Sequence, residues 1–177
     1  ILIDAGTKIT DLDKIVASIT SKPVKLVATH VHPDHTGSSI NYFSEIYLHE
    51  ADTVNIRRMM SDYKGKINYL NDGDVIELGG RKISVVHLPG HTPGSIAFLD
   101  YDKSYGFSGD AFGSGNLLLG TDFSTLKATC EKMKKIMAEN GISKMYPGHF
   151  NGANFETPAR IDNMLKVCND ILSGELK

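Results

Sequence analysis

Near the start of the chain, four side chains that bind metal ions in proteins occur within six positions: His30, His32, Asp34 and His35. They follow the apolar run from Leu26 to Ala28, which predicts a short buried strand. Because Pro33 prevents a regular helix across the cluster, we expect the four side chains in a turn at the carboxyl end of that strand. Open α/β sheets place their binding sites at such strand ends.

This mixture of imidazole and carboxylate groups suits zinc, and also iron or manganese. Four ligands so close together cannot easily face one ion, so two neighbouring ions that share the turn are the simpler arrangement. A lone histidine is usually a surface residue or a satisfied core residue. Three imidazoles and a carboxylate at one strand end bring no packing benefit, however, so the cluster predicts a metal site.

Three further segments repeat this arrangement, in which an apolar strand is followed by Gly or Pro and then by a metal-binding side chain. They are Pro89-Gly90-His91, Ser108-Gly109-Asp110 and Pro147-Gly148-His149. Each motif alone is weak, since Pro-Gly-His can be any turn. Four such strand ends in one chain are a strong joint signal for a two-metal site.

Periodic apolar residues predict the elements that must position these side chains. Helices are expected at 11–21, where Asp11 is the cap, at 38–44, 51–61 and 125–140, and from Thr157-Pro158 onward. The last helix is expected to bury Ile161, Leu165, Cys168 and Leu172. Strands are expected at 1–3, 25–29, 46–48, 75–78, 82–87, 96–100, 104–108 and 144–146. This order predicts mixed sheets covered by helices.

The composition is that of an ordinary globular protein. The 177 residues fit one domain, and a net charge of -2 without a long Lys or Arg run argues against a nucleic-acid-binding surface. No stretch is long and apolar enough to span a bilayer. Cys130 and Cys168 lack disulfide or metal spacing, so we expect small buried hydrophobes and, by default, a cytoplasmic location. The chain opens inside the apolar run Ile1-Leu2-Ile3, so we expect that preceding strands are absent from it.

Five segments together resemble the metallo-β-lactamase-fold superfamily, in the family's order: Ile3 to Gly6, Thr29 to His35, Pro89 to Gly94, Ser108 to Asp110 and Pro147 to His149. The complete His-x-His-x-Asp-His pattern is most similar to the glyoxalase II-like branch. The resemblance implies the α/β (α+β) class, as a four-layer αβ/βα sandwich of two mixed sheets flanked by helices. It also implies one hydrolase domain over residues 1–177 that lacks its first strands.

The resemblance assigns a role to each candidate ligand. One divalent ion is expected to be held by three histidines: His30, His32 and His91. The second ion is expected to be held by a carboxylate and two histidines: Asp34, His35 and His149. Asp110 is expected to bridge the two ions, and Asp4 to support the ligand loop by orienting an imidazole. His49 and His87 remain as structural or surface residues.

By the same resemblance, the chain is a metal-dependent hydrolase. Two divalent ions, zinc first with iron or manganese as alternatives, lower the pKa of a shared water. The resulting bridging hydroxide, held through Asp34 and Asp110 as the catalytic carboxylates, is expected to cleave a small ester, thioester or lactone. A hydroxyacylglutathione is one such thioester, but the glutathione-binding helical region of dedicated glyoxalase II enzymes has no counterpart here. The expected partner is a small molecule, without nucleic acid or membrane.

Two alternative functions remain open. The segment from Asp110 to Gly113 resembles part of the flavodiiron oxidoreductases, which suggests a di-iron redox protein. Against this alternative, His32 stands where those proteins typically carry Glu. A metal-stabilised domain without activity is the other alternative. The stretch from Ala111 to Gly115 is expected to form either a lip over the substrate or a surface loop. Tyr146 points either into the site or away from it.

Overall fold

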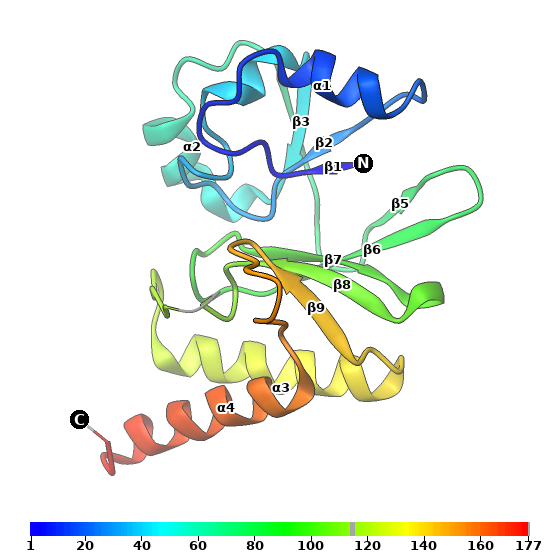
Figure 1. Cartoon of the computed structure of the whole chain (residues 1–177). Coiled ribbons are helices and arrows are strands. Elements are labelled where there is room, and N and C mark those ends of the chain that lie inside the picture. Colours follow the sequence, from blue (N-terminus) through cyan, green and yellow to red (C-terminus); the bar gives the residue numbers. More distant parts are fainter. Residues whose placement is uncertain (114–115, 177) are drawn as a thin grey trace.

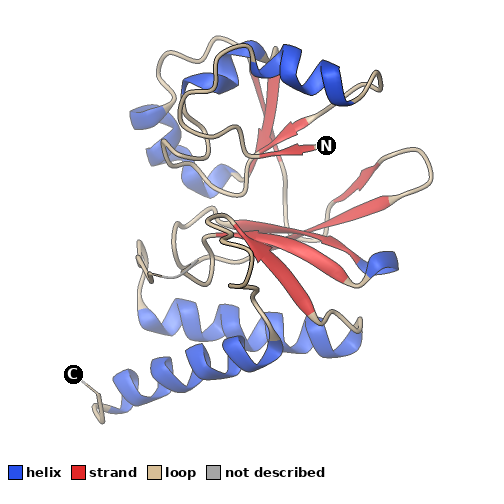
Figure 2. Cartoon of the chain, viewed as in Figure 1, coloured by secondary structure: helices blue, strands red, loops and turns tan. Residues whose placement is uncertain are grey.

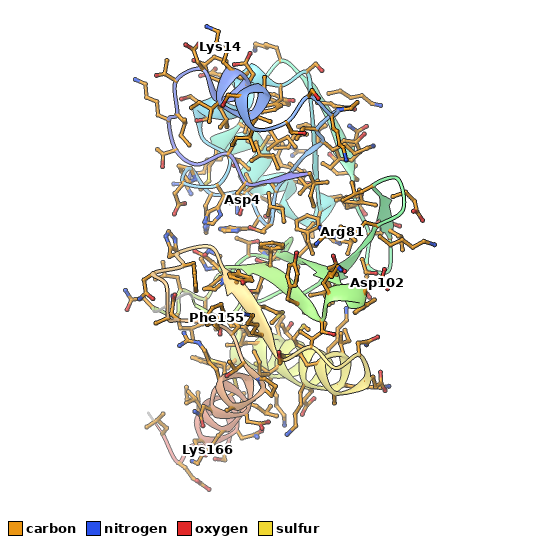
Figure 3. The ribbon with its side chains drawn as sticks, turned by 45° about the vertical axis from the view of Figure 1, so that its right-hand side comes forward. Asp4, Lys14, Arg81, Asp102, Phe155 and Lys166 are labelled. Carbon is orange, nitrogen blue, oxygen red and sulfur yellow. The ribbon has the colours of Figure 1, made fainter. Side chains whose placement is uncertain are left out.

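The computed structural model describes residues 1–113 and 116–176 and arranges them in four layers (Figure 1). Helices form the two outer layers, and two sheets face each other between them, one from each half of the chain (Figure 2). Lys14 and Lys166 lie on opposite outer layers, while Asp4 lies between the two halves (Figure 3). The αβ/βα sandwich predicted from the sequence is confirmed.

The first sheet has four parallel strands in sequence order: β1 (Leu2–Ile3), β2 (Leu26–Val27), β3 (Glu45–Leu48) and β4 (Lys66–Tyr69). Two helices pack on its outer face: α1 (Leu12–Ile19) and α2 (Thr53–Met59). Parallel strands need such crossover connections. The sequence did not predict β4. It is a short edge strand, and of its residues only Ile67 packs on the apolar cluster between this sheet and its two helices.

The second sheet has five strands: β5 (Val75–Glu77), β6 (Lys82–His87), β7 (Ile96–Asp100), β8 (Tyr105–Gly109) and β9 (Lys144–Pro147). The first four pair antiparallel as hairpins and β9 is parallel to β8, so this sheet is the mixed one. Its outer face carries α3 (Phe123–Glu139) and α4 (Pro158–Ser173). Three short 3-10 turns complete the chain: η1 (Ser38–Tyr42), η2 (Glu50–Asp52) and η3 (Tyr101–Lys103).

Alternation along the strands explains why the sheets stack. Val27, Val85 and Phe98 point into the space between the sheets and form a shared buried cluster. Their neighbours Val86 and Leu99 point outward, into the cluster under α3 and α4. Successive side chains of a strand face opposite sides, so strands buried on both faces read as continuous apolar runs. Cys130 and Cys168 are free and buried in the helix-side cluster, as predicted.

Several local predictions need correction. Asp11 precedes α1 but does not cap it: its backbone is left-handed, with φ 56, and its carboxylate lies 3.1 Å from Nζ of Lys14. Leu172 is half-exposed rather than buried, because it lies in the last turns of α4, which extend away from the sheets (Figure 1). The helix predicted at 38–44 is a 3-10 turn, and the one at 51–61 divides into η2 and α2.

The strand directions bring the predicted ligand segments to one edge. Since β7 is antiparallel to both β6 and β8, and β9 is parallel to β8, the carboxyl ends of β6, β8 and β9 coincide. The loop after β2 reaches the same edge, where the Ile96 N–H donates to the Thr29 carbonyl over 2.8 Å. Within the described residues, no helix combines the length and the apolarity needed to cross a membrane.

Candidate metal centre

The structure gathers all seven predicted ligands at this edge, in overlapping groups of three. One group, called here the first cluster, consists of His30, His32 and His91. The second cluster consists of Asp34, His35 and His149. A further group joins His30 and His35 to Asp110, so the two clusters are contiguous. Within each group the potential ligand atoms lie within 4.8 Å of one another.

The ring nitrogens of the first cluster point at a common position. Nε2 of His91 lies 2.9 Å from Nδ1 of His32 and 3.2 Å from Nε2 of His30. Nε2 of His30 lies 3.1 Å from Nδ1 of His32. His30 and His91 are buried and His32 is half-buried, so bulk water has little access to these atoms.

The outer nitrogens of two of these rings fix their tautomers. Nδ1 of His91 donates to the carbonyl of Leu118 over 2.7 Å, which leaves a lone pair on Nε2. The hydroxyl of Thr29 donates to Asp4 and therefore accepts from Nδ1 of His30, at 3.1 Å, which again leaves a lone pair on Nε2. Such outer partners are typical of metal-ligating histidines. Two lone pairs facing each other repel unless a cation lies between them.

Burial lowers the pKa of His30 well below its ordinary value, and the neighbouring His35 and His91 lower it further. Neutral imidazole is the form that binds metal. His30 therefore presents a neutral nitrogen donor to the first cluster.

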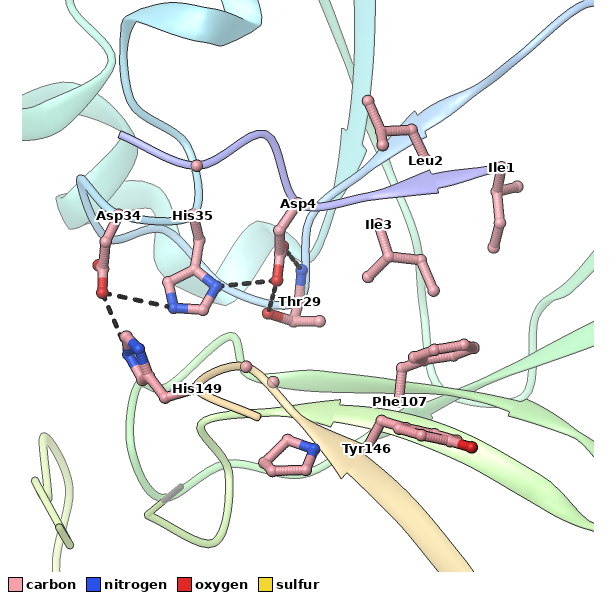
Figure 4. Close-up of a pocket in the computed structure, with 14 residues that line it drawn as sticks. Ile1, Leu2, Ile3, Asp4, Thr29, Asp34, His35, Phe107, Tyr146 and His149 are labelled. Carbon is pink, nitrogen blue, oxygen red and sulfur yellow. Dashed lines mark hydrogen bonds and ion pairs between the residues drawn. The ribbon is translucent and has the colours of Figure 1, made fainter. Parts of the chain in front are cut away.

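The second cluster is more open. Nε2 of His149 lies 3.2 Å from Oδ2 of Asp34, and the two side chains are 54% and 46% exposed. His35 is buried beside them, with Nε2 at 3.7 Å from Oδ2 of Asp34. Figure 4 shows the three side chains converging at one end of a cavity between the sheets.

Asp4 supports His35 as predicted. Its Oδ2 accepts from Nδ1 of His35 over 2.8 Å, and its Oδ1 accepts from the Thr29 N–H over 2.7 Å (Figure 4). Nε2 of His35, by contrast, is buried without a hydrogen-bond partner. Burial alone would lower the pKa of His35, but the carboxylates of Asp110 and Asp4 outweigh it and raise that pKa to about 10. These surroundings favour a positive charge at the imidazole edge that faces the cluster.

Asp110 lies between the two clusters. Its Oδ2 is 3.1 Å from Nε2 of His149, 3.6 Å from Nε2 of His35 and 3.9 Å from Nε2 of His91. The Pro-Gly-His motif has a steric reason here: a Cβ on Gly148 would lie 2.4 Å from Oδ1 of Asp110. Gly109, with φ 52, likewise approaches Thr29 too closely for any side chain.

This set of donors fits divalent metal ions. It combines imidazole nitrogens with converging lone pairs, a buried imidazole nitrogen without a hydrogen-bond partner, and a central carboxylate. All seven predicted side chains take part in this arrangement.

Two partners of the ligands were not predicted. Thr29 could have been found from its place beside His30, because a hydroxyl there can reach the ring. The Leu118 carbonyl could not, since every residue has one and the contact spans 27 positions. His49 and His87 stack, with ring centroids 3.9 Å apart and planes 9° apart, and the structure keeps both outside the clusters.

Tyr146 points into the cavity between the sheets, which measures about 500 Å³. Its ring stacks on Phe107, with centroids 5.6 Å apart, and Ile1 and Ile3 lie opposite (Figure 4). Asp34, His35 and His149 line one end of this cavity, which therefore adjoins the second cluster (Figure 4). A second hollow of about 320 Å³ adjoins the first cluster, between α2 and the loop that carries His91.

The predicted lip at 111–115 needs correction. Ala111 and Phe112 are buried in the cluster under α3, because the chain turns inward after β8 and Phe112 fills that core. Ser114 and Gly115 lie outside the described residues.

Comparison with known proteins agrees with the resemblance. The metallo-beta-lactamase superfamily matches residues 1–149. The chain is 32% identical over 160 residues to acyl-coenzyme A thioesterase MBLAC2 of Homo sapiens, covering 73% of this chain and 57% of that protein. It is 29% identical over 152 residues to a hydroxyacylglutathione hydrolase of Hyphomonas neptunium, covering 82% and 54%. The chain thus spans about half the length of these curated relatives.

Among solved structures, TTHA1623 in a di-iron-bound form is similar at a TM-score of 0.64 and 25% identity. The similarity covers 92% of this chain and 86% of that one. The sandwich is therefore shared with this solved structure.

Proposed function

The chain belongs to the metallo-beta-lactamase superfamily, and from this premise we propose that it is a metal-dependent hydrolase with a paired metal centre. The observation that carries the proposal is the position of Asp110, whose Oδ2 lies within 3.9 Å of imidazole nitrogens from both clusters. A carboxylate in that position suits two ions that share one ligand. The hydrolase domain proposed for this activity extends over residues 1–177.

In this proposal each cluster holds one ion. The first ion would be bound by His30, His32 and His91, and the second by Asp34, His35 and His149. Asp110 would be shared between them. Divalent ions bound there supply Lewis acidity, which polarises an acyl carbonyl and lowers the pKa of water.

The chain's own groups prepare this chemistry. Thr29 and the Leu118 carbonyl orient the imidazoles of His30 and His91, and Asp4 orients that of His35. Asp34 is half-exposed at the mouth of the second cluster. It is therefore placed to pass a proton to a leaving group, in addition to its role as a ligand.

The proposed substrate class is a small ester, thioester or lactone, with acyl thioesters first. Two relatives are named for thioester cleavage, an acyl-coenzyme A thioesterase and a hydroxyacylglutathione hydrolase. The hollow beside the first cluster agrees with an acyl group, because it places apolar Val54 and Pro93 next to His32 and His91.

Zinc is the metal proposed first, on the basis of the nitrogen-rich first cluster. Iron is the alternative, since TTHA1623 is known in a di-iron-bound form and this donor set also suits iron. A cytoplasmic location stays a prediction.

The test is hydrolysis of a panel of acyl-coenzyme A thioesters, hydroxyacylglutathione, aryl esters and lactones by the purified protein, reconstituted separately with zinc and with iron. We expect turnover of at least one thioester or ester, lost on chelation and restored by metal. Absence of hydrolysis in a protein that binds both ions would contradict the proposal and favour a metal-stabilised domain. Consumption of oxygen or nitric oxide by the reduced iron form, without hydrolysis, would instead favour the di-iron redox alternative.

A further inference from the structure

Asp52, the last residue of η2, carries a buried carboxylate outside both clusters. Only 2% of the residue is exposed. Its Oδ2 accepts from the Val31 N–H over 2.8 Å and from the Thr92 hydroxyl over 3.0 Å. Its Oδ1 accepts from the Gly94 N–H over 2.7 Å. A buried charge with three donors is a satisfied and specific arrangement.

These donors come from the two loops that carry the first cluster. Val31 stands between the ligands His30 and His32, in the loop after β2 of the first sheet. Thr92 directly follows the ligand His91, in the loop after β6 of the second sheet. One carboxylate therefore joins the backbones of two ligand loops that belong to different sheets.

We infer that Asp52 is a positioning residue of the metal centre, which sets the distance between His91 and the pair His30 and His32. Asp52 contacts neither the reacting atoms nor the ring nitrogens of the first cluster. It acts through the peptide groups on either side of the ligands. This inference deepens the proposed function and rests on its assignment of the first cluster to a metal ion.

The fit around the carboxylate is close. A Cβ on Gly94 would lie 2.6 Å from Cγ of Asp52, so the Gly of the Thr-Pro-Gly turn lets that loop reach the carboxylate. Two neighbouring histidines add a second tie between the same segments. Nδ1 of His49 accepts from the Ala51 N–H at the start of η2, and Nε2 of His87 donates to the Pro93 carbonyl over 2.8 Å. Their stacked rings thus hold η2 beside the loop that carries His91.

An asparagine at position 52 cannot accept hydrogen bonds from all three donors that the Asp52 carboxylate satisfies. In Asp52→Asn one oxygen becomes an NH2 group. If that group replaces Oδ2, it faces the Val31 N–H and the Thr92 hydroxyl; if it replaces Oδ1, it faces the Gly94 N–H. Loss of such an outer partner typically reduces metal affinity roughly 10- to 100-fold. We expect this reduction for the ion of the first cluster, while the ion of the second cluster keeps its affinity.

The experiment compares three variants of the full chain: Asp52→Asn, Thr92→Val and Asp100→Asn. Thr92→Val removes one of the three donors and keeps the side-chain shape. Asp100→Asn is the matched control, because Asp100 is equally buried and accepts from the Lys103 N–H over 3.0 Å at the far end of β7. Zinc affinity is measured by competition with a chromophoric chelator, and folding by circular dichroism with and without metal.

We expect weaker binding of one zinc ion in Asp52→Asn, a smaller loss in Thr92→Val, and unchanged binding in Asp100→Asn at a comparable loss of melting temperature. Wild-type zinc affinity in folded Asp52→Asn would overturn the inference. If Asp52→Asn does not fold, wild-type affinity in Thr92→Val overturns it instead. Failure of the proposed function can be told apart from failure of this inference. If the wild-type protein binds zinc but hydrolyses nothing, the proposed function fails, while the effect of Asp52 on zinc affinity can still be measured.

Discussion

Histidines contribute to both clusters, with Asp34 as an additional carboxylate in the second, but the two clusters sit in different surroundings. In the first cluster, His30 and His91 are buried, and each has its outer nitrogen engaged by a protein group. In the second, Asp34 and His149 are about half exposed, and only His35 is buried and held by Asp4. The comparison teaches that ligand identity alone does not determine how rigidly a metal site is built.

The difference has a structural origin. Loops from both sheets contribute to each cluster, but Asp52 joins the backbones of the two loops that carry the first and so restrains it from several sides. His149 follows β9 on a short exposed loop, in which Asn154 donates to its carbonyl over 3.0 Å. Preorganised ligands lose less conformational freedom on binding. We therefore expect the first cluster to bind its ion more tightly than the second.

The largest effect is expected from His30→Ala. His30 supplies a nitrogen to the first cluster and also lies in the group that contains His35 and Asp110. Its loss should weaken metal binding and turnover by more than the roughly 100-fold that outer partners of ligands contribute. Metal content and steady-state hydrolysis measure it, with Cys168→Ala in the helix layer as a control that keeps activity. Unchanged turnover in His30→Ala would refute the ligand assignment.

A smaller and selective effect is expected from His149→Ala. Because His149 belongs only to the open cluster, this variant should keep the tightly bound ion and lose the other, so metal content per chain falls to about one. Elemental analysis after gel filtration measures the change. If both ions were lost together, the clusters would not differ in strength and the comparison would fail.

Asp4→Asn changes a carboxylate outside the second cluster that accepts a hydrogen bond from His35. The variant weakens the hydrogen bond that orients His35 directly, and it reaches the first cluster indirectly, through the Thr29 hydroxyl that donates to Asp4 and accepts from His30. We expect roughly a 10-fold loss of affinity for the weaker ion. Chelator competition measures both affinities, and an equal loss for the two ions would show that Asp4 acts on the whole edge.

A further prediction concerns folding stability instead of metal binding, and a buried carboxyl outside both clusters. Burial raises the pKa of Glu156 from 4.5 to about 7, against the opposing pull of Arg160, and Asp110 adds a small further increase. Between these values the folded state holds a proton that the unfolded state has lost, so stability should fall as pH rises from about 4.5 to about 7.

Glu156→Gln removes this pH dependence. Relative to the wild type, the variant should gain stability between pH 5 and pH 8, by roughly 3 kcal/mol at most. Thermal melting of both proteins at the two pH values measures the gain, and the metal content of each sample is checked in parallel. If the difference in stability between the variant and the wild type did not change with pH, Glu156 would be ionised over the whole range.

Much of the centre was predictable because its ligands follow strands in recognisable motifs. His30, His91 and His149 each stand just after an apolar run and a turn, and parallel strand directions bring such ends together. Asp52 was missed because its donors lie 21 to 42 positions away and nothing local marks it. Asp11 was misjudged because a capping residue type does not by itself produce capping geometry.

The most direct test of the paired and unequal clusters is a titration of the metal-free wild-type protein with zinc, in which isothermal titration calorimetry measures the binding. We expect about two zinc ions per chain, bound in two resolved steps, as a paired centre of unequal sites requires. Binding of a single ion, or of two ions in one indistinguishable step, would contradict it.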